Sequence, residues 1–467
     1  MTAARFNRSA RIAARCAAAV LALLAPTASS AQRRPSGRAA AAIDSLVRAP
    51  VDAHRVAGIS VAVVRGTDTL FSRAYGVAEV ENAVPATSGH VFEIASVTKQ
   101  FTAAAVLLLV QDGKVGLDDE ITRYLPNAPT QGRRITIRQL LSHTSGLVDV
   151  PDLPSFQFLK RRDVPTDSVI ALARGVPFYF PPGEQMRYSN TGFLLAGQLI
   201  ETLSGKTYAD FIAERLLRPA GMSRSRYCDQ RALIPHLARG YDFTPDGFRP
   251  AGFINLQIPF AAGGLCSTAL DLVSWTRAVF GGRLLAPAML DEMVRPTALG
   301  DGHVTRYGLG VGVGTIAGHR AYHHGGDIDG FTSYLAWFPA DSLSIAVLIN
   351  TQGPVRPDPL LAQIAEAVLG PDRAPSEPPP DDLARFAGRY GGDVVVTASD
   401  GALTLVRGPL PPVKLRYAGG TTFTDGRARY TFEPGNGPPA RVWADLVWAF
   451  VRWDRDGSAG EGRPGSD

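Results

Sequence analysis

The sequence is poor in lysine and in cysteine. Five of its 48 basic residues are lysines, and 467 residues contain only three cysteines. No later part of the chain approaches the about 20 consecutive apolar residues of a membrane-spanning helix, so we expect no transmembrane segment in the mature protein. The net charge of +5 includes four arginines from the first 31 residues, which leaves about +1. Nucleic-acid binding therefore has no electrostatic support.

The first 31 residues are typical of a secretory signal peptide. Four arginines precede a short apolar core at residues 17–24, and Ser29-Ser30-Ala31 supplies small residues for cleavage. We therefore expect an exported protein, periplasmic or extracellular. In such an oxidising compartment Cys228 and Cys266 either form a disulfide or remain two buried thiols, and the sequence alone does not decide between these alternatives.

The rest of the chain predicts two domains joined by a linker. PDRAPSEPPPDD, residues 371–382, is rich in proline and charge, as linkers are. Residues 32–370 would form a large α/β domain, in which strands from both ends build one antiparallel sheet with helices on its faces and a helical subdomain beside it. Residues 383–467 would form a small all-β, barrel-like domain, because DVVVTA, ALTLVR and RYTFEP read as short strands. The patterns predict helices near 39–55, 96–111, 136–142, 191–203, 207–217, 269–280 and 359–368, and strands at GISVAVVR, TLFSRAYGVAE, YGLGVGVGTI, GFTSYLAWF and SLSIAVLIN.

One lysine stands at the head of an apolar helix. In FEIASVTKQFTAAAVLLLVQDG, residues 92–113, Ser96 and Lys99 are three positions apart and share one face. A desolvated lysine can lose its proton near neutral pH, whereas arginine cannot. The free N–H groups at the helix start favour developing negative charge. The pair is thus a candidate nucleophile and base, although an N-cap serine beside a surface lysine is the simpler alternative.

Two further segments carry polar groups suited to a cleft. Tyr188-Ser189-Asn190 ends a loop just before a helix, where it is either a packed turn with a cap or a source of a hydroxyl and an amide. His323-His324-Gly325-Gly326 lies at the presumed edge of the terminal strand, and its glycines permit close approach of a ligand. Neither an HExxH pattern nor a GxSxG elbow occurs, so neither a metal site nor an α/β-hydrolase is indicated. We interpret Lys206-Thr207 as surface capping.

These segments, in this order, resemble the motifs of the serine β-lactamase and penicillin-binding-protein superfamily, and most of all its class C branch with related esterases and D-aminopeptidases. The motifs are Ser96-Val97-Thr98-Lys99, Tyr188-Ser189-Asn190 and His324-Gly325-Gly326, and LLSHTSGL at residues 140–147 is similar to a further family segment. The resemblance implies the β-lactamase/transpeptidase-like fold and a C-terminal domain of a kind often appended to such hydrolases. It also implies that no cofactor or metal is needed.

The resemblance assigns a role to each motif residue. Ser96 would be the acylated nucleophile, Lys99 its proton acceptor, and Tyr188 the group that passes protons to the leaving group and later activates water. Asn190, His324, Gly325 and Gly326 would bind substrate. The backbone N–H groups of Ser96 and Asp327 would form the oxyanion hole.

One departure from the motif concerns substrate choice. His324 replaces the lysine of the classical Lys-Thr-Gly, and a histidine attracts a substrate carboxylate only when it is protonated, near or below pH 6.5. We therefore expect a secreted serine hydrolase that acts on an ester, an amide or a D-amino-acid peptide bond of a small or cell-wall-derived substrate. The alternatives are a true β-lactamase or D-alanyl-D-alanine carboxypeptidase, and a non-catalytic binder of cell-wall peptide. The sequence does not indicate the acyl donor, the oligomeric state or the role of the C-terminal domain.

Overall fold

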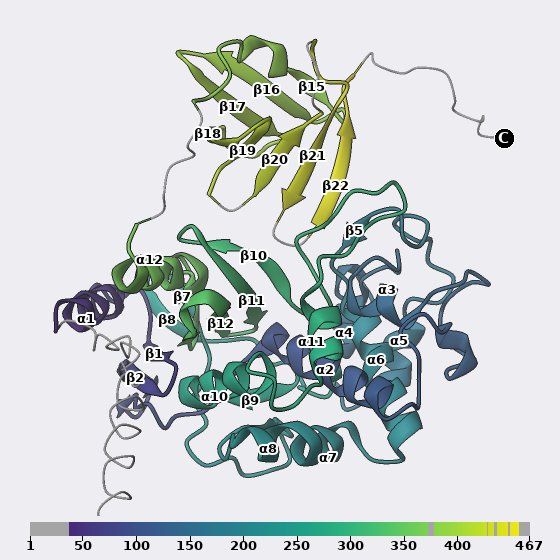
Figure 1. Cartoon of the computed structure of the whole chain (residues 1–467). Helices are drawn as coiled ribbons and strands as arrows, with labels where there is room; N and C mark the ends of the chain where they lie inside the picture. Colours follow the sequence, from purple (N-terminus) through teal and green to yellow (C-terminus); the bar gives the residue numbers. More distant parts are fainter. Residues whose placement is uncertain (1–36, 372–377, 427, 434–436, 447–448, 457–467) are drawn as a thin grey trace, which may run out of the picture.

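The computed structural model describes residues 37–371, 378–426, 428–433, 437–446 and 449–456, which form a large α/β domain and a smaller β domain (Figure 1). The predicted signal peptide, residues 372–377 of the predicted linker and residues 457–467 lie outside these ranges. Within the described part of the chain, no helix is both long and apolar enough to cross a bilayer.

Strands from both ends of the large domain meet in one antiparallel sheet, as predicted. The pairing of β1 (Gly58–Arg65) with β13 (Leu343–Ile349) joins the two ends, from Ile59 opposite Ile349 to Arg65 opposite Leu343. Both strands are almost continuously apolar and β-branched, which suits strands buried on both faces. The remaining strands of this sheet are β10 (Gly312–Ile316), β11 (His319–Ile328) and β12 (Phe331–Phe338) beyond β13, and β2 (Asp68–Glu79) and β3 (Val84–Pro85) beyond β1.

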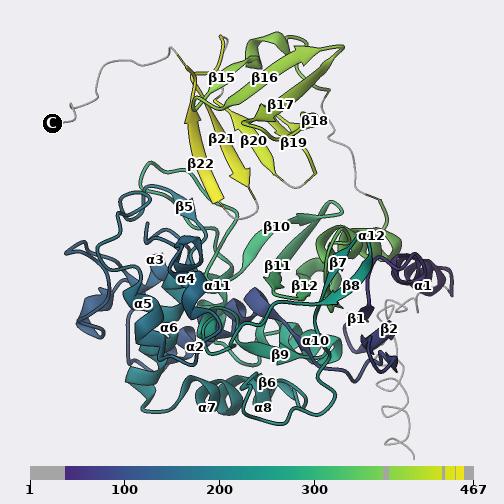
Figure 2. The same cartoon turned by 180° about the vertical axis from the view of Figure 1, so that it is seen from behind.

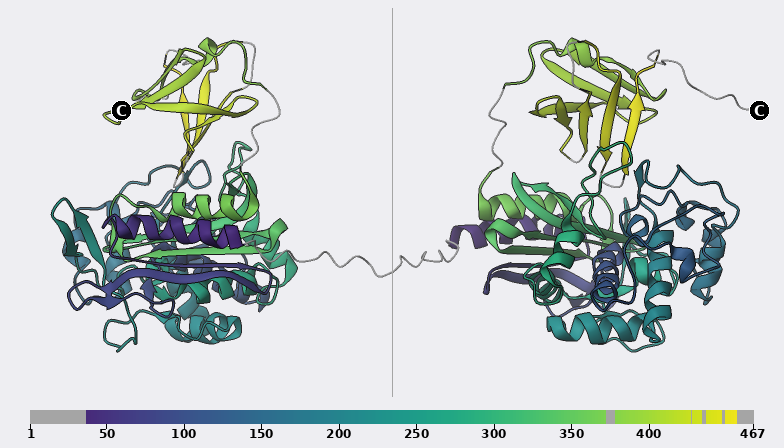
Figure 3. Two further views of the ribbon diagram at one scale, coloured as in Figure 1. Left: turned by 90° about the vertical axis from the view of Figure 1, so that its left-hand side faces the viewer. Right: turned by 45° about the vertical axis from the view of Figure 1, so that its right-hand side comes forward.

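Helices cover both faces of this sheet. The first and last helices of the domain, α1 (Gly37–Asp52) and α12 (Pro357–Leu369), lie side by side on one face, as Figure 3 shows. Ile43 and Val47 are one turn apart on α1 and are buried there, so this stripe seals the sheet. Helix α10 (Ala269–Val279) packs on the opposite face against β1 and β13.

The helical subdomain lies beside the sheet and surrounds α2 (Thr98–Gln111). This helix is buried on nearly all sides and contacts α6 (Asn190–Ser204) and α9 (Phe260–Gly263). Thr207 caps the next helix by accepting the backbone N–H of Asp210, so the interpretation of Lys206-Thr207 as a cap is confirmed. The other helices are α3 (Ile137–Leu141), α4 (Phe156–Leu159), α5 (Thr166–Ala171), α7 (Tyr208–Ile212), α8 (Arg218–Ala220) and α11 (Pro287–Val294).

The end of the sheet differs from the prediction in two details. The predicted strand over 307–316 begins only at residue 312, because the chain first turns at Gly310, whose φ of +68° favours glycine. The two-histidine, two-glycine segment belongs to a strand of its own, β11, whose pairing with β10 ends at His323, so His324, Gly325 and Gly326 pair with β12 and lie at the sheet edge, as expected. Glycines have low strand propensity, and the pattern therefore concealed this strand.

A disulfide joins Cys228 and Cys266, whose Cα atoms are 5.5 Å apart. Cys266 belongs to β9 (Leu265–Ser267), which pairs on one side with β6 (Arg226–Tyr227) and on the other with β4 (Phe92–Glu93). The disulfide thus anchors the small sheet whose strand β4 leads directly to Ser96.

The C-terminal β domain is a nearly closed meander, seen from both sides in Figures 1 and 2. Its ends meet where the Gly391 N–H donates to the Asp454 carbonyl oxygen, 2.9 Å away. Its core contains Phe386, Phe423 and Phe432. The strands are β15 (Gly388–Tyr390), β16 (Val394–Ser399), β17 (Ala402–Arg407), β18 (Val413–Gly419), β19 (Thr422–Thr424), β20 (Arg429–Phe432), β21 (Arg441–Leu446) and β22 (Ala449–Asp454), and β22 also pairs with β5 (Met186–Arg187) of the large domain.

Candidate active site

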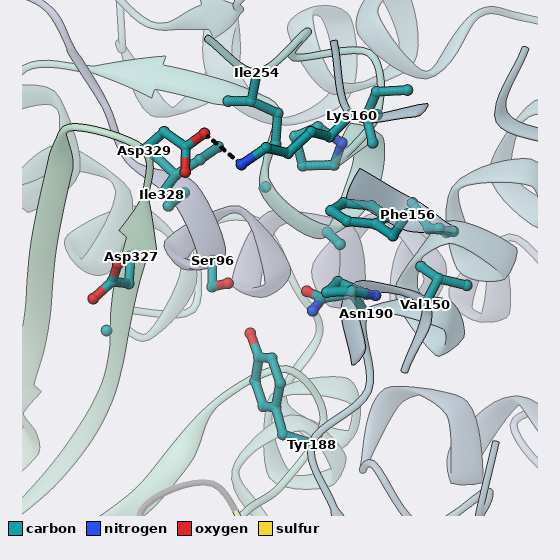
Figure 4. Close-up of a pocket in the computed structure, with 18 of the residues that line it drawn as sticks. Ser96, Val150, Phe156, Lys160, Tyr188, Asn190, Ile254, Asp327, Ile328 and Asp329 are labelled. Carbon is teal, nitrogen blue, oxygen red and sulfur yellow. Dashed lines mark hydrogen bonds and ion pairs between the residues drawn. The ribbon is translucent and has the colours of Figure 1, made fainter. Parts of the chain in front are cut away.

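Ser96 lies on a short turn between β4 and α2. Residues Ala95–Val97 form a 3₁₀ turn, and the helix continues from Thr98, close to the predicted start. Ala95 has a φ of +47°, a strained conformation for a residue with a side chain. The hydroxyl of Ser96 faces a cavity together with Tyr188 and Asn190, as Figure 4 shows.

Lys99 is completely buried, and its ammonium group lies among three oxygen atoms. Its Nζ is 3.0 Å from the Ser96 hydroxyl, 2.8 Å from the Asn190 amide oxygen and 2.8 Å from the Ala262 carbonyl oxygen. Burial lowers the pKa of Lys99 to about 7, while the negative charge of Asp149 opposes this fall. A neutral amine within reach of a serine hydroxyl can accept its proton.

A carboxylate that the sequence analysis missed completes this group. Asp149 accepts the backbone N–H of Asn190 at 2.7 Å and its side-chain amide at 3.0 Å, and thereby orients the amide oxygen toward Lys99. Burial raises the pKa of Asp149 to about 6. Both ends of the Asn190 amide are thus committed inside the site, although this residue also lines the cavity. The only sequence signal for Asp149 is its position just after the family-like segment at residues 140–147.

Tyr188 faces Ser96 from the other side. Its ring lies 4.6 Å from the Lys99 Nζ and 4.3 Å, between centroids, from the ring of His143. Burial raises the pKa of Tyr188 above its ordinary value, against the opposite effect of a hydrogen bond with Ser96. Tyr188 is therefore a protonated phenol at neutral pH.

A line of hydrogen bonds lies behind Tyr188. The Ser189 N–H donates to His143 Nδ1 at 3.1 Å, so the other ring nitrogen of His143 carries the proton and donates to the Tyr307 hydroxyl at 3.2 Å. The Tyr307 hydroxyl in turn donates to His324 Nε2 at 2.8 Å, and His324 Nδ1 donates to the Gly325 carbonyl oxygen at 2.6 Å. This arrangement suits two neutral histidines.

The expectation that His324 becomes cationic near pH 6.5 and attracts a substrate carboxylate is wrong. Burial, the Lys99 charge and neighbouring His323 lower the pKa of His324 to about 3, against the bond to Gly325. His324 is 2% exposed and is not among the residues that line the Ser96 cavity, whereas Gly325 is. The sequence could not show that the hydroxyl of Tyr307 would form a hydrogen bond with the imidazole of His324.

The glycine pair allows β11 to lie against the Ser96 turn. A Cβ atom at Gly326 would overlap the carbonyl oxygen of Ile94 and the hydroxyl of Ser333. Ser333 itself donates to the Ile94 oxygen at 2.9 Å and fastens β12 to the same turn. Such close contact between strand and turn is what an oxyanion hole made of backbone N–H groups from both would require.

The cavity beside Ser96 has a volume of about 450 Å³. Its two cations are each paired with a carboxylate, Lys160 with Asp329 at 3.1 Å and Arg356 with Asp327 at 2.6 Å (Figure 4 shows the first pair). The cavity therefore offers little net positive charge to a substrate. Its apolar wall is formed by Val150, Pro151, Phe156, Leu194, Ile254, Ile258, Pro259 and Ile328. Among the described residues, no group of three His, Cys, Asp or Glu side chains is arranged to hold a metal ion.

The fold and this constellation define a serine hydrolase of the β-lactamase/transpeptidase-like class. The chain belongs to the Beta-lactamase family, which it matches over residues 43–369. It is 29% identical over 328 residues to penicillin-binding protein 4* of Bacillus subtilis (strain 168), across 66% of this chain and 72% of that protein.

Two solved structures show similar folds. The D-amino acid amidase of Ochrobactrum anthropi SV3, solved with L-phenylalanine amide, is 29% identical with a TM-score of 0.63 and covers 71% of this chain and 98% of its own. The structure of SurE is 28% identical with a TM-score of 0.62 and covers 90% of this chain and 99% of its own. The second likeness therefore extends into the C-terminal β domain.

Proposed function

We propose that this protein is a hydrolase that works through an acyl intermediate on Ser96. The observation that carries the proposal is the 3.0 Å contact between the Ser96 hydroxyl and the amine of a fully buried Lys99. Lys99 takes the serine proton, and the Ser96 oxygen attacks the carbonyl carbon of the substrate. Tyr188, as a phenol, donates a proton to the departing amine or alkoxide. Its phenolate then takes a proton from the water that attacks the ester, and Lys99 returns its proton to the Ser96 oxygen as the acid product leaves.

The oxyanion and the substrate occupy the space between Ser96 and β11 in this proposal. The backbone N–H groups of Ser96 and Asp327 stabilise the oxyanion, and Gly325 and Gly326 keep the strand close. His324 acts from behind the cavity wall rather than on the substrate. Asn190 keeps Lys99 in place while its exposed edge borders the substrate.

The cavity favours an acyl group with an apolar side chain and no free carboxylate. Its wall is apolar, and its two cations are already paired. Amides of apolar D-amino acids fit this description, because they carry an apolar side chain and no free carboxylate. The likeness to a D-amino acid amidase supports this choice. β-Lactams and D,D-peptides carry a carboxylate and are the less favoured substrates, and the intact Ser96, Lys99 and Tyr188 disfavour a non-catalytic binding protein.

We also propose that the protein is exported and that its domains span residues 32–370 and 383–467. The signal-like residues 1–31 motivate this proposal, and the Cys228–Cys266 disulfide supports it, because disulfides persist in oxidising compartments. N-terminal sequencing of the protein recovered from the producing cell tests it. A mature protein that still begins at Met1 would refute it.

A fluorophosphonate probe followed by peptide mapping tests the central proposal. We expect labelling of Ser96 in the wild type, none in Ser96→Ala, and normal labelling in Ser168→Ala, which alters an exposed serine on α5. Labelling of another residue, or none, would refute the assignment. The wild type should then hydrolyse D-phenylalanine amide and p-nitrophenyl acetate faster than nitrocefin. A wild type faster on nitrocefin would refute the substrate class and leave the acyl-enzyme standing.

A further inference from the structure

The C-terminal β domain reaches the strand that leads into Tyr188. In β22, Ala449 pairs with Arg187 and the next residue pairs with Met186, and these two partners are the whole of β5 (Figures 1 and 2). A two-residue strand has no stability of its own. On its other side, the Arg187 N–H donates to the His143 carbonyl oxygen at 3.0 Å. The backbone just before Tyr188 is thus held between β22 and the segment of His143.

A tryptophan of the same domain packs behind the active site. Trp443, on β21, is 4% exposed and forms a buried cluster with Met186, Leu299 and Tyr307 of the large domain. Its ring centroid is also 3.5 Å from that of His303. Large buried aromatic side chains contribute strongly to the energetics of interfaces, so this cluster stabilises the contact of the domain with the large domain.

Tyr307 connects this cluster to the catalytic group. Its ring belongs to the same buried cluster as Trp443, while its hydroxyl lies between His143 at 3.2 Å and His324 at 2.8 Å. The ring of His143 in turn packs on Tyr188. Tyr307 and His143 therefore connect the cluster that contains Trp443 to Tyr188.

An ion pair between the domains fixes the same region. The guanidinium of Arg306, the neighbour of Tyr307, pairs with the carboxylate of Asp445 on β21 and also donates to the Asp445 carbonyl oxygen at 3.2 Å. Both side chains are mostly buried. The strand, the tryptophan and the ion pair all act on the short segments that carry Tyr188 and Tyr307.

We propose that the C-terminal β domain is a working part of the active site, in which Trp443 and Tyr307 are positioning residues that hold Tyr188 within reach of Ser96. The proposal rests on the acyl-enzyme function proposed above. Proton transfer requires a hydrogen-bond distance of about 3 Å, and a displacement of about 1 Å can cost up to about 100-fold in rate. Detachment of the domain thus lowers turnover although none of its described residues lines the Ser96 cavity.

Replacement of one hydroxyl tests the link through Tyr307. We expect Tyr307→Phe to lower kcat for p-nitrophenyl acetate at least about tenfold and to change KM less than about twofold. The reason is that Tyr188 is displaced while the cavity that binds the substrate is not. Tyr241→Phe is the matched control, since the buried Tyr241 hydroxyl also makes two hydrogen bonds, with the Val80 N–H and Glu81. It should melt at a similarly lowered temperature and keep its kcat. Equal kcat in the two variants would overturn the role of Tyr307.

A charge exchange across the interface tests the role of the domain. We expect Arg306→Asp and Asp445→Arg each to lower kcat several-fold, and the double variant to recover at least half of the wild-type kcat, because it restores the ion pair in reverse. Trp443→Leu should also lower kcat, and adding Arg306→Asp together with Asp445→Arg to this variant should not restore it. Single variants with wild-type kcat, or a double variant no better than the singles while all are folded by circular dichroism, would overturn the inference.

Labelling and turnover of the wild type distinguish failure of this inference from failure of the proposed function. If the fluorophosphonate probe labels Ser96 and p-nitrophenyl acetate is hydrolysed, but all interface variants match the wild type, only the positioning inference fails. If the folded wild type is not labelled at Ser96, the acyl-enzyme function fails and this inference fails with it.

Discussion

Lys99 makes the rate of acylation depend on pH in a direction that the structure determines. The group that accepts the Ser96 proton is the neutral amine, so activity requires Lys99 to be deprotonated. Burial lowers its pKa from the ordinary 10.5 to about 7. At pH 7 about half of the molecules then carry the neutral amine, against fewer than about 0.1% for an ordinary lysine. The fall in pKa corresponds to roughly 5 kcal/mol of preference for the neutral form.

The rate of Ser96 labelling is expected to fall on the acid side of its pH profile only. The rate of Ser96 labelling by the fluorophosphonate probe should rise about tenfold per pH unit below pH 6 and level off above pH 8. No loss should follow on the alkaline side up to about pH 9, because the pKa of Tyr188 is raised and its phenol keeps its proton. Labelling is the preferred assay, since it reports the attack by the Ser96 oxygen without a product-release step.

Asp149 supplies the control for this reasoning. Its carboxylate raises the pKa of Lys99, so Asp149→Asn should move the acid limb to lower pH, whatever it does to the maximal rate. A labelling rate that is flat from pH 5 to 8, or that still rises tenfold per unit above pH 9, would refute the assignment of Lys99 as a buried, neutral base. A limb that moves to higher pH in Asp149→Asn would refute the electrostatic account of the pair.

Three more predictions concern single positions. Lys99→Arg should lower kcat as severely as Lys99→Ala, by about 100-fold or more, because arginine keeps a charge but accepts no proton; near-normal turnover of the arginine variant would contradict a proton-transfer role. Cys228→Ser should lower the free energy of unfolding by roughly 3–4 kcal/mol in urea titrations, since the disulfide closes a loop between residues 38 apart, and an unchanged midpoint would count against a disulfide in solution. Gly326→Ala should lower kcat at least about 100-fold by pushing β11 from the Ser96 turn. The control Gly314→Ala, where a Cβ has room, should keep its activity. Equal activity of the two variants would refute the packing argument.

Most of the fold could be predicted because its elements carry strong local patterns. The sheet built from both chain ends follows from the apolar, β-branched runs of β1 and β13. One of the missed elements is β11, whose glycine pair hides a strand that tertiary contacts stabilise. The order of the strands and the pairing of the C-terminal domain with β5 depend on contacts between distant segments, which no local pattern reports.

The residues of the candidate site were also predicted only in part. Ser96, Lys99, Tyr188 and Asn190 stand in short motifs, and the structure brings all four to one cavity or its wall. Asp149, His143 and Tyr307 act through contacts between segments far apart in the chain, and sequence periodicity says nothing about these. His324 was identified from its motif, but it does not become cationic near pH 6.5 as expected, because burial lowers its pKa.

The pairing of β1 with β13 has a consequence for the time at which the enzyme becomes reactive. The Ala57 N–H donates to the hydroxyl of Thr351, 294 positions later, so the sheet cannot close until the ribosome has passed that point. At about 5–20 residues per second, roughly 15 to 60 s separate the synthesis of the two strands. Ser96 and Lys99 are translated early in this interval, whereas β11 arrives near its end. A growing chain therefore carries its serine without the strand that would complete an oxyanion hole, and a chain that stalls before Thr351 should be released as an inert product rather than as an unregulated hydrolase.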